Sequence, residues 1–110
     1  MKPVSTLIIA CLMALSSAAT AGGDAQNGKA LSATCAACHG ADGNSTITLN
    51  PILAGQHEDY LLKALRDYKS GARNNPVMAG MVAALSDQDL QDLAAYFAAQ
   101  KGLKSINFTE

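Results

Sequence analysis

The stretch Cys35-Ala36-Ala37-Cys38-His39 decides how the rest of the chain is interpreted. Two cysteines separated by two residues, with a histidine directly after the second, form the pattern that attaches a c-type haem. Residues i and i+3 lie on the same face of a helical turn, so both thiols can reach the two vinyl groups of one porphyrin. The imidazole that follows can then bind the iron. The stretch predicts one covalently attached haem with His39 as its proximal ligand.

Two other chemistries use a CxxC pattern. A structural zinc site needs four good ligands, and only two histidines, His39 and His57, accompany the cysteine pair. A redox disulfide usually occurs in a βαβ setting, and no stretch alternates strongly enough to predict a strand. Haem attachment is therefore the favoured interpretation.

The segments around the motif predict an all-α domain of three main helices and two long loops. The helices are expected at 23–36, 57–70 and 86–101, and the loops at 40–56 and 72–85. Asp24 and Ser86 are suitable N-caps, and Gly71 is placed to end the second helix. The chain has no Trp and few aromatic residues, so its core is small. A porphyrin would supply the missing apolar volume, and we expect the haem-free chain to be poorly folded.

A distant residue must supply any sixth iron ligand, and the candidates are Met78, Met81 and His57. A methionine gives a higher haem potential than a second histidine does. Both methionines fall in the second predicted loop, and spacing alone does not choose between them. His57 stands at a predicted helix start among charged residues, where a solvated or capping role is the favoured interpretation.

The first 21 residues have the features of a secretory signal peptide. An uncharged apolar run extends from Val4 to Leu15, and Ala19-Thr20-Ala21 has the small-x-small form of a cleavage site. We expect a domain boundary here, with a signal peptide at 1–21, a mature domain at 22–110 and export to the periplasm, an oxidising compartment. An uncleaved anchor and lipidation at Cys11 are the alternatives.

The charge is nearly balanced, with 8 basic and 9 acidic residues. Removal of Lys2 with the signal peptide leaves 7 basic residues. This balance gives no reason to expect binding to nucleic acid or strong association with a membrane surface. Long-range steering of a partner is expected to be weak.

Four segments together resemble class I cytochromes c, and most closely small bacterial periplasmic monohaem cytochromes or one half of the two-haem type. The matching segments are residues 35–40, 49–55 and 78–85 and the terminal helix with its sequence Ala94-Ala95-Tyr96-Phe97. The resemblance implies the all-α cytochrome c fold around one covalent haem c held by Cys35 and Cys38.

The resemblance also implies roles for single residues. The sixth ligand in such proteins lies eight residues before the helix-capping serine, which here is Met78 relative to Ser86. Pro51 resembles the proline whose carbonyl accepts a hydrogen bond from the proximal imidazole. Gly28 with Tyr96 or Phe97 resembles the glycine–aromatic crossing of the first and last helices.

The function implied by this resemblance is periplasmic electron transfer, without enzymatic activity. The expected partners are a quinol-oxidising complex upstream and a terminal oxidase, a nitrogen-oxide reductase or a peroxidase downstream, and the protein is expected to be a monomer. The alternative is a haem c subunit of a periplasmic dehydrogenase or reductase complex. The two-haem relatives continue into a second domain, whereas a single haem is expected here.

Overall fold

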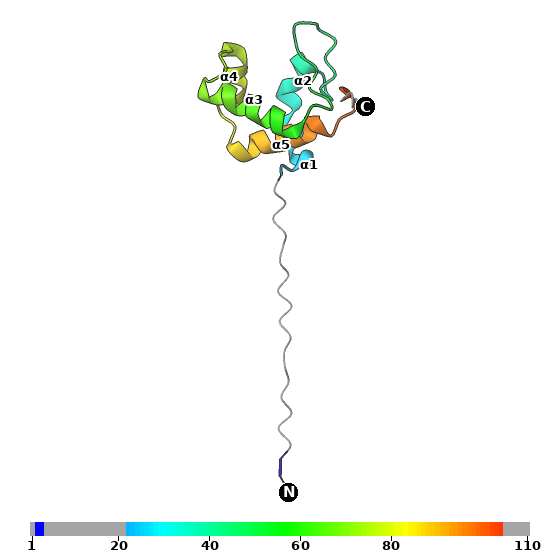
Figure 1. Cartoon of the computed structure of the whole chain (residues 1–110), viewed down its shortest axis with the longest axis vertical. Helices are drawn as coiled ribbons and strands as arrows, with labels where there is room; N and C mark the ends of the chain where they lie inside the picture. Colours follow the sequence, from blue (N-terminus) through cyan, green and yellow to red (C-terminus); the bar gives the residue numbers. More distant parts are fainter. Residues whose placement is uncertain (1, 4–21, 105–110) are drawn as a thin grey trace, which may run out of the picture.

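Five α-helices and their connecting loops make up the folded part of the protein. The computed structural model describes residues 2–3 and 22–104, and within these ranges it contains no strand. The helices are α1 (Ala25–Leu31), α2 (Ala33–His39), α3 (Glu58–Ser70), α4 (Pro76–Val82) and α5 (Asp87–Ala98) (Figure 1). The predicted all-α class is confirmed.

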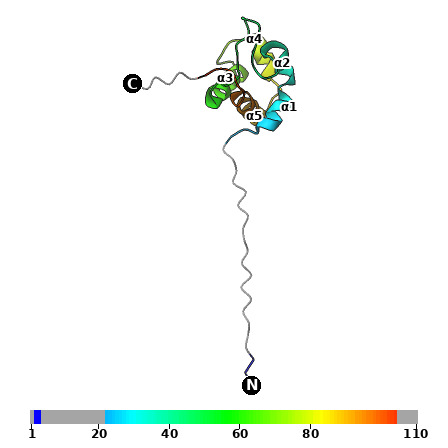
Figure 2. The same ribbon diagram turned by 90° about the vertical axis from the view of Figure 1, so that its right-hand side faces the viewer.

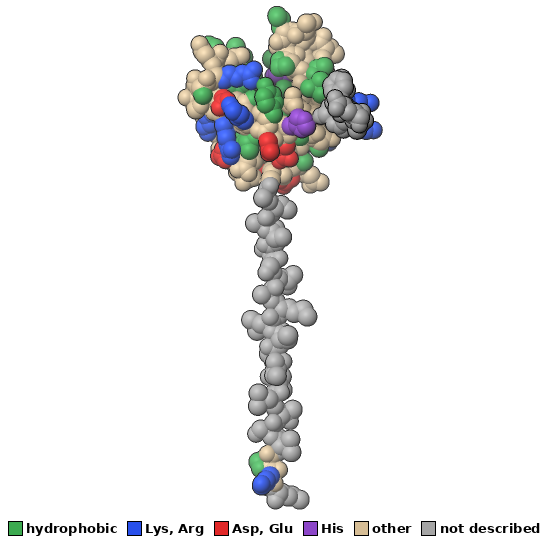
Figure 3. All heavy atoms as spheres, in the orientation of Figure 1, with side chains coloured by type: hydrophobic (Ala, Val, Ile, Leu, Met, Phe, Trp, Pro, Cys, Tyr) green, Lys and Arg blue, Asp and Glu red, His purple; other side chains and the backbone are tan. Residues whose placement is uncertain are grey.

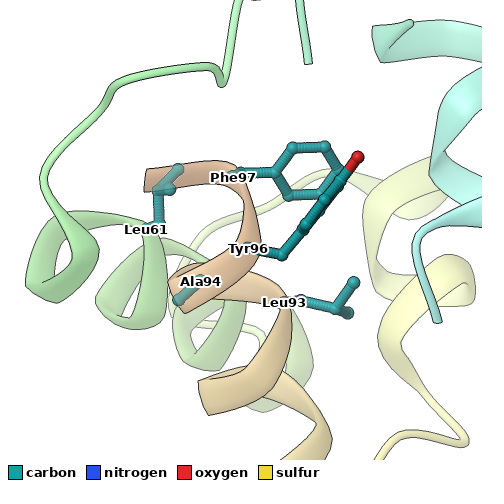
Figure 4. Close-up of a cluster of buried hydrophobic side chains, with 5 residues drawn as sticks. All are labelled: Leu61, Leu93, Ala94, Tyr96 and Phe97. Carbon is teal, nitrogen blue, oxygen red and sulfur yellow. The ribbon is translucent and has the colours of Figure 1, made fainter. Parts of the chain in front are cut away.

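Helix α5 is the centre of the packing. It lies between α1 and α3, which pack against its two sides (Figure 2). Figure 4 shows the apolar side chains of the resulting cluster: Leu61 comes from α3, whereas Leu93 and Tyr96 project from α5 away from α3. The Tyr96 and Phe97 rings make an edge-to-face contact with centroids 5.1 Å apart. The buried cluster consists of Leu61, Leu93, Ala94, Tyr96 and Phe97. The apolar residues of α5 therefore form its buried face.

The crossing of α1 and α5 depends on Gly28. A Cβ atom on this residue would lie 2.0 Å from the carbonyl oxygen of Asp92 and 2.8 Å from the Cβ of Tyr96. Only a residue without a side chain allows the two backbones to come this close. The predicted glycine–aromatic crossing is confirmed, with Tyr96 as its aromatic partner.

The predicted helix ends agree with the structure at three places. The Asp24 carboxylate caps α1, and Ser86 forms a capping box with Asp89 at the start of α5. Gly71 ends α3 in the left-handed conformation, with φ at 84°.

Two expectations from the sequence were wrong. The first predicted helix is divided at Ser32, whose hydroxyl donates to the Lys29 carbonyl and competes with the helical hydrogen bonds. The second predicted loop contains α4. Asn75-Pro76 is compatible with a turn, but the Asn75 side chain caps α4 and Pro76 occupies its first turn, where proline is well tolerated.

Two lobes rise from this helical base. One contains α4 with the end of α3, and the other contains α2 with the loop that follows it; Figure 3 shows a notch between them, with hydrophobic side chains on both sides. No helix within residues 22–104 has the length and apolar character that crossing a bilayer requires. The predicted signal peptide lies outside the described residues, except for Lys2 and Pro3.

Candidate haem site

The two cysteines of the motif project from the short helix α2. Cys35 is half-buried, Cys38 is exposed, and neither forms a disulfide. Burial raises the pKa of the Cys35 thiol, which keeps it in the uncharged form. The i, i+3 spacing on a formed helix places both thiols on one face, as covalent attachment to one flat ligand requires.

His39 is the last residue of α2 and is buried, with 7% of its surface exposed. Its Nδ1 lies 2.9 Å from the carbonyl oxygen of Pro51. A carbonyl can only accept, so Nδ1 carries the proton and Nε2 is the nitrogen left with a free lone pair. Gly40, with φ at 84°, turns the chain immediately after this histidine. The contact between His39 and Pro51 matches the expectation from the sequence, and the imidazole is held in the tautomer that can bind a metal through Nε2.

Hydrogen bonds join the two ends of the loop that carries Pro51. The Gly43 carbonyl accepts hydrogen bonds from the backbone N–H groups of Leu53 and Ala54, at 2.8 and 3.2 Å. The Tyr96 hydroxyl donates to the Ala41 carbonyl at 2.9 Å and joins the start of the loop to α5. These contacts hold the acceptor for His39 in a defined place.

The three candidate sixth ligands differ in their surroundings. Met78 and Met81 both lie on α4, where Met78 is half-buried and Met81 is 50% exposed. The backbone N–H of Met78 donates to the Asn75 side chain at 3.1 Å, which fixes the first turn of α4. His57 is exposed and occupies the N-cap position of α3. All three residues remain candidates for the sixth iron ligand, and Met78 is the most enclosed of them.

The donor set and the exposed apolar side chains of this part of the protein suit a large apolar cofactor. Two thiols and an imidazole with a free Nε2 project from α2, and thioether side chains project from α4 in the other lobe. Several large hydrophobic side chains are exposed on the loop after α2, on α3 and on α4: Ile47, Leu49, Ile52, Tyr60, Val77 and Met81. The chemistry of these residues fits a haem. Within the described ranges, no group of three or more His, Cys, Asp and Glu residues is arranged to hold a metal ion.

Sequence reasoning missed the residues that secure the loop. Asn44 donates from Nδ2 to the carbonyl of Lys101 at 2.8 Å and to Asp42 Oδ2 at 2.9 Å. The run Asp42-Gly43-Asn44 lies in the loop predicted at 40–56. No local pattern indicates that one of its side chains reaches Lys101, just after α5 and 57 residues away.

Comparisons with known proteins agree with this site. The Cytochrome c family matches residues 25–101. A cytochrome c4 of Pseudomonas aeruginosa is 51% identical over 100 residues, which cover 89% of this chain and 50% of that protein. Cytochrome c-554(548) of Halomonas halodenitrificans is 40% identical over 82 residues, covering 72% of this chain and 99% of that protein.

A solved structure extends the match to three dimensions. Reduced recombinant cytochrome c4 from Pseudomonas stutzeri superimposes with a TM-score of 0.70 at 51% identity, over 74% of this chain and 47% of that one. The chain therefore spans about half the length of the cytochrome c4 relatives that it matches. The cofactor of the family is haem c, bound covalently through cysteines. From its fold, its motif and these matches, the chain belongs to the cytochrome c family.

Proposed function

We propose that the protein is an electron carrier whose one haem c is bound by His39 and Met78. The observation that carries the proposal is the buried imidazole of His39, which ends the CxxCH stretch and is held at Nδ1 by the Pro51 carbonyl. A hydrogen bond of this kind fixes the ring orientation and raises the basicity of the other nitrogen. When bound, the haem supplies a one-electron couple between ferric and ferrous iron.

The other roles follow from the chemistry of each side chain. Cys35 and Cys38 attach the cofactor through their thiols, and Pro51 orients the proximal ring. Met78 is assigned as the second axial ligand because it is half-buried, whereas Met81 is 50% exposed. We assign Met81 to the wall of the haem pocket. Two strong axial ligands leave no open position for a substrate, so the protein is a carrier rather than an enzyme.

The location and domain boundaries belong to the same proposal. Residues 1–21 act as a signal peptide, and residues 22–110 form the mature domain in the periplasm. The nearly balanced charge is the reason to expect neither nucleic acid nor strong membrane association. The mature protein is expected to be a monomer that meets its partners transiently.

The partners are assigned by class. A quinol-oxidising complex supplies the electron, and a terminal oxidase or a periplasmic reductase accepts it. A second candidate function is that of a haem subunit bound to a periplasmic dehydrogenase. This candidate is favoured by a relative in Chlorobaculum tepidum, 37% identical over 70 residues, that is the cytochrome subunit of a sulfide dehydrogenase.

A redox titration combined with carbon monoxide binding tests the carrier proposal. We expect the purified holoprotein to titrate reversibly as one centre with a one-electron slope, and the spectrum of the reduced form to stay unchanged under carbon monoxide. Ready binding of carbon monoxide would mean an open iron site and would contradict the proposal. Stoichiometric co-purification of a catalytic subunit would favour the dehydrogenase alternative.

A further inference from the structure

The loop between α2 and α3 is fastened to the C-terminal segment by one carboxamide. Asn44 donates from Nδ2 to the Lys101 carbonyl at 2.8 Å and to Asp42 Oδ2 at 2.9 Å, while its backbone N–H donates to Asp42 Oδ1 at 3.0 Å. The hydrogen bonds to Asp42 hold the Asn44 side chain in one orientation. The bond to Lys101 then joins two parts of the chain that are distant in sequence.

The C-terminal segment is packed closely against the other end of the same loop. Leu103 donates from its backbone N–H to the Ala54 carbonyl at 2.7 Å. A Cβ atom on Gly102 would lie 2.5 Å from that carbonyl oxygen and 2.8 Å from Asn44 Oδ1. Figure 1 shows the orange end of α5 and the segment directly after it beside the foot of the loop. The segment after α5 therefore contacts both ends of the loop.

A short backbone path connects Asn44 to the acceptor for His39. Asn44 directly follows Gly43, whose carbonyl accepts from Leu53 and Ala54. Pro51 precedes Leu53 by two residues and accepts from His39 at 2.9 Å. Movement of the 42–44 turn would thus move the backbone that carries the Pro51 carbonyl.

We propose that Asn44 is a positioning residue for the proximal histidine, acting through the loop that presents the Pro51 carbonyl to His39. This inference rests on the proposed function, in which His39 binds the iron. With the Asn44–Lys101 bond intact, the Nδ1–H of His39 stays bonded and shielded from water. Without that bond, the loop opens more often, the Nδ1 proton exchanges faster and the imidazole becomes a weaker donor to the iron.

The test compares two asparagine-to-alanine variants of the holoprotein. Asn44→Ala removes the loop contact. Asn27→Ala is the matched control, because the side chain of Asn27 also makes a hydrogen bond between distant elements, to Asp92 on α5, and does not contact the loop. Each variant is measured by NMR exchange of the His39 Nδ1 proton in the reduced state, by redox titration and by denaturation.

We expect exchange of the His39 proton to be roughly five- to tenfold faster in Asn44→Ala, the factor that corresponds to the loss of one ordinary hydrogen bond. The potential should rise, because a weaker imidazole donor stabilises ferric iron less. In Asn27→Ala the potential should be unchanged, and exchange should change only as far as global stability does. The proposal is overturned if either readout of Asn44→Ala matches that of Asn27→Ala after correction for stability.

Asn44→Asp is a second variant that keeps the side-chain shape and lacks the N–H donor, and it should behave like Asn44→Ala. If neither Asn44 variant accumulates as holoprotein while Asn27→Ala does, Asn44 serves the fold as a whole and the positioning role is rejected. Failure of the proposed function gives a different result. In that case the wild-type protein itself lacks ring resonances of His39 shifted by a bound haem.

Discussion

The buried carboxylate of Asp92 links α5 to α1 and its N-cap through hydrogen bonds, and its removal gives a quantitative test of the packing. Asp92 is 2% exposed. Its Oδ1 accepts from the backbone N–H of Asp24 at 2.7 Å and from Gln88 Nε2 at 2.9 Å, and its Oδ2 accepts from Asn27 Nδ2 at 2.6 Å. These bonds hold the start of α1, and α1 leads directly into the helix with the two cysteines.

The expected cost of Asp92→Ala follows from these three donors. A hydrogen bond to a charged group contributes about 1.5–3 kcal/mol, and the N–H of Asp24 is fixed in the backbone and cannot turn away. Asn27 and Gln88 are exposed residues, so their carboxamides regain water and each adds only about 0.5 kcal/mol. We therefore expect a loss of about 3 kcal/mol, a large part of the stability of a small domain.

The effect should depend on pH in a defined direction. The hydrogen bonds to Asp92, that from Asn27 first, hold the pKa of its carboxyl below the ordinary value. The unfolded chain takes up this proton near pH 4, whereas the folded protein takes it up only at lower pH. The stabilisation is therefore complete above about pH 4 and is lost as the pH falls through the folded pKa. The difference in unfolding free energy between wild type and Asp92→Ala should therefore be smaller at pH 3 than at pH 7.

The assay is denaturant unfolding of the holoprotein, followed by far-ultraviolet circular dichroism at pH 7 and pH 3. Asp67→Ala is the matched control, because Asp67 pairs with a largely exposed lysine, Lys63, and such pairs contribute less than about 1 kcal/mol. The reasoning would be refuted if Asp92→Ala lost no more unfolding free energy than the control. It would also be refuted if the difference between wild type and Asp92→Ala did not change with pH.

Three further changes probe other contacts. Gly28→Ala should lower the free energy of unfolding by about 3 kcal/mol, because the new Cβ would lie 2.0 Å from the Asp92 carbonyl oxygen. The control is Gly80→Ala on α4, whose new Cβ would have no heavy atom of the described residues within 4 Å apart from its chain neighbours and the backbone of its own helix, and which should be neutral or stabilising. Equal thermal midpoints of the two variants would contradict this prediction. Tyr96→Phe should cost about 1 kcal/mol in denaturant unfolding, because the bond to the Ala41 carbonyl is lost, and a midpoint equal to that of wild type would rule this out. Replacement of both CxxCH cysteines by serine should abolish covalent haem and most of the helical circular dichroism, and retention of the full helical signal would show that the core needs no cofactor.

The features that could be predicted from the sequence are those that neighbouring residues determine. The CxxCH spacing requires only one helical turn. Asp24 and Ser86 cap the helices that follow them directly, and Gly71 ends α3 because it adopts positive φ. The contact between His39 and Pro51 was expected only through the resemblance to a family, because it joins residues 12 apart in a loop without periodicity.

The features that were missed depend on tertiary contacts or on ambiguous local signals. Asn75-Pro76 is compatible with a turn and with a helix start, and the short helix α4 has too few residues for a visible period. Asp92 in a helix suggests a solvated face, but α5 is covered on two sides, by α3 and by α1. Asp92 lies on the side of α5 that α1 covers, and it can be buried there because α1 and its N-cap supply hydrogen-bond donors. The sequence does not show that these two segments meet.

The measurement that tests the central assignment most directly is the far-red absorption band of methionine-bound ferric haem in two single variants. The account predicts that Met78→Ala loses this band and that Met81→Ala keeps it, because Met78 is the enclosed thioether of α4 and Met81 is half exposed. Loss of the band in Met81→Ala with retention in Met78→Ala would contradict the ligand assignment. Absence of the band from the wild-type protein would contradict methionine ligation altogether.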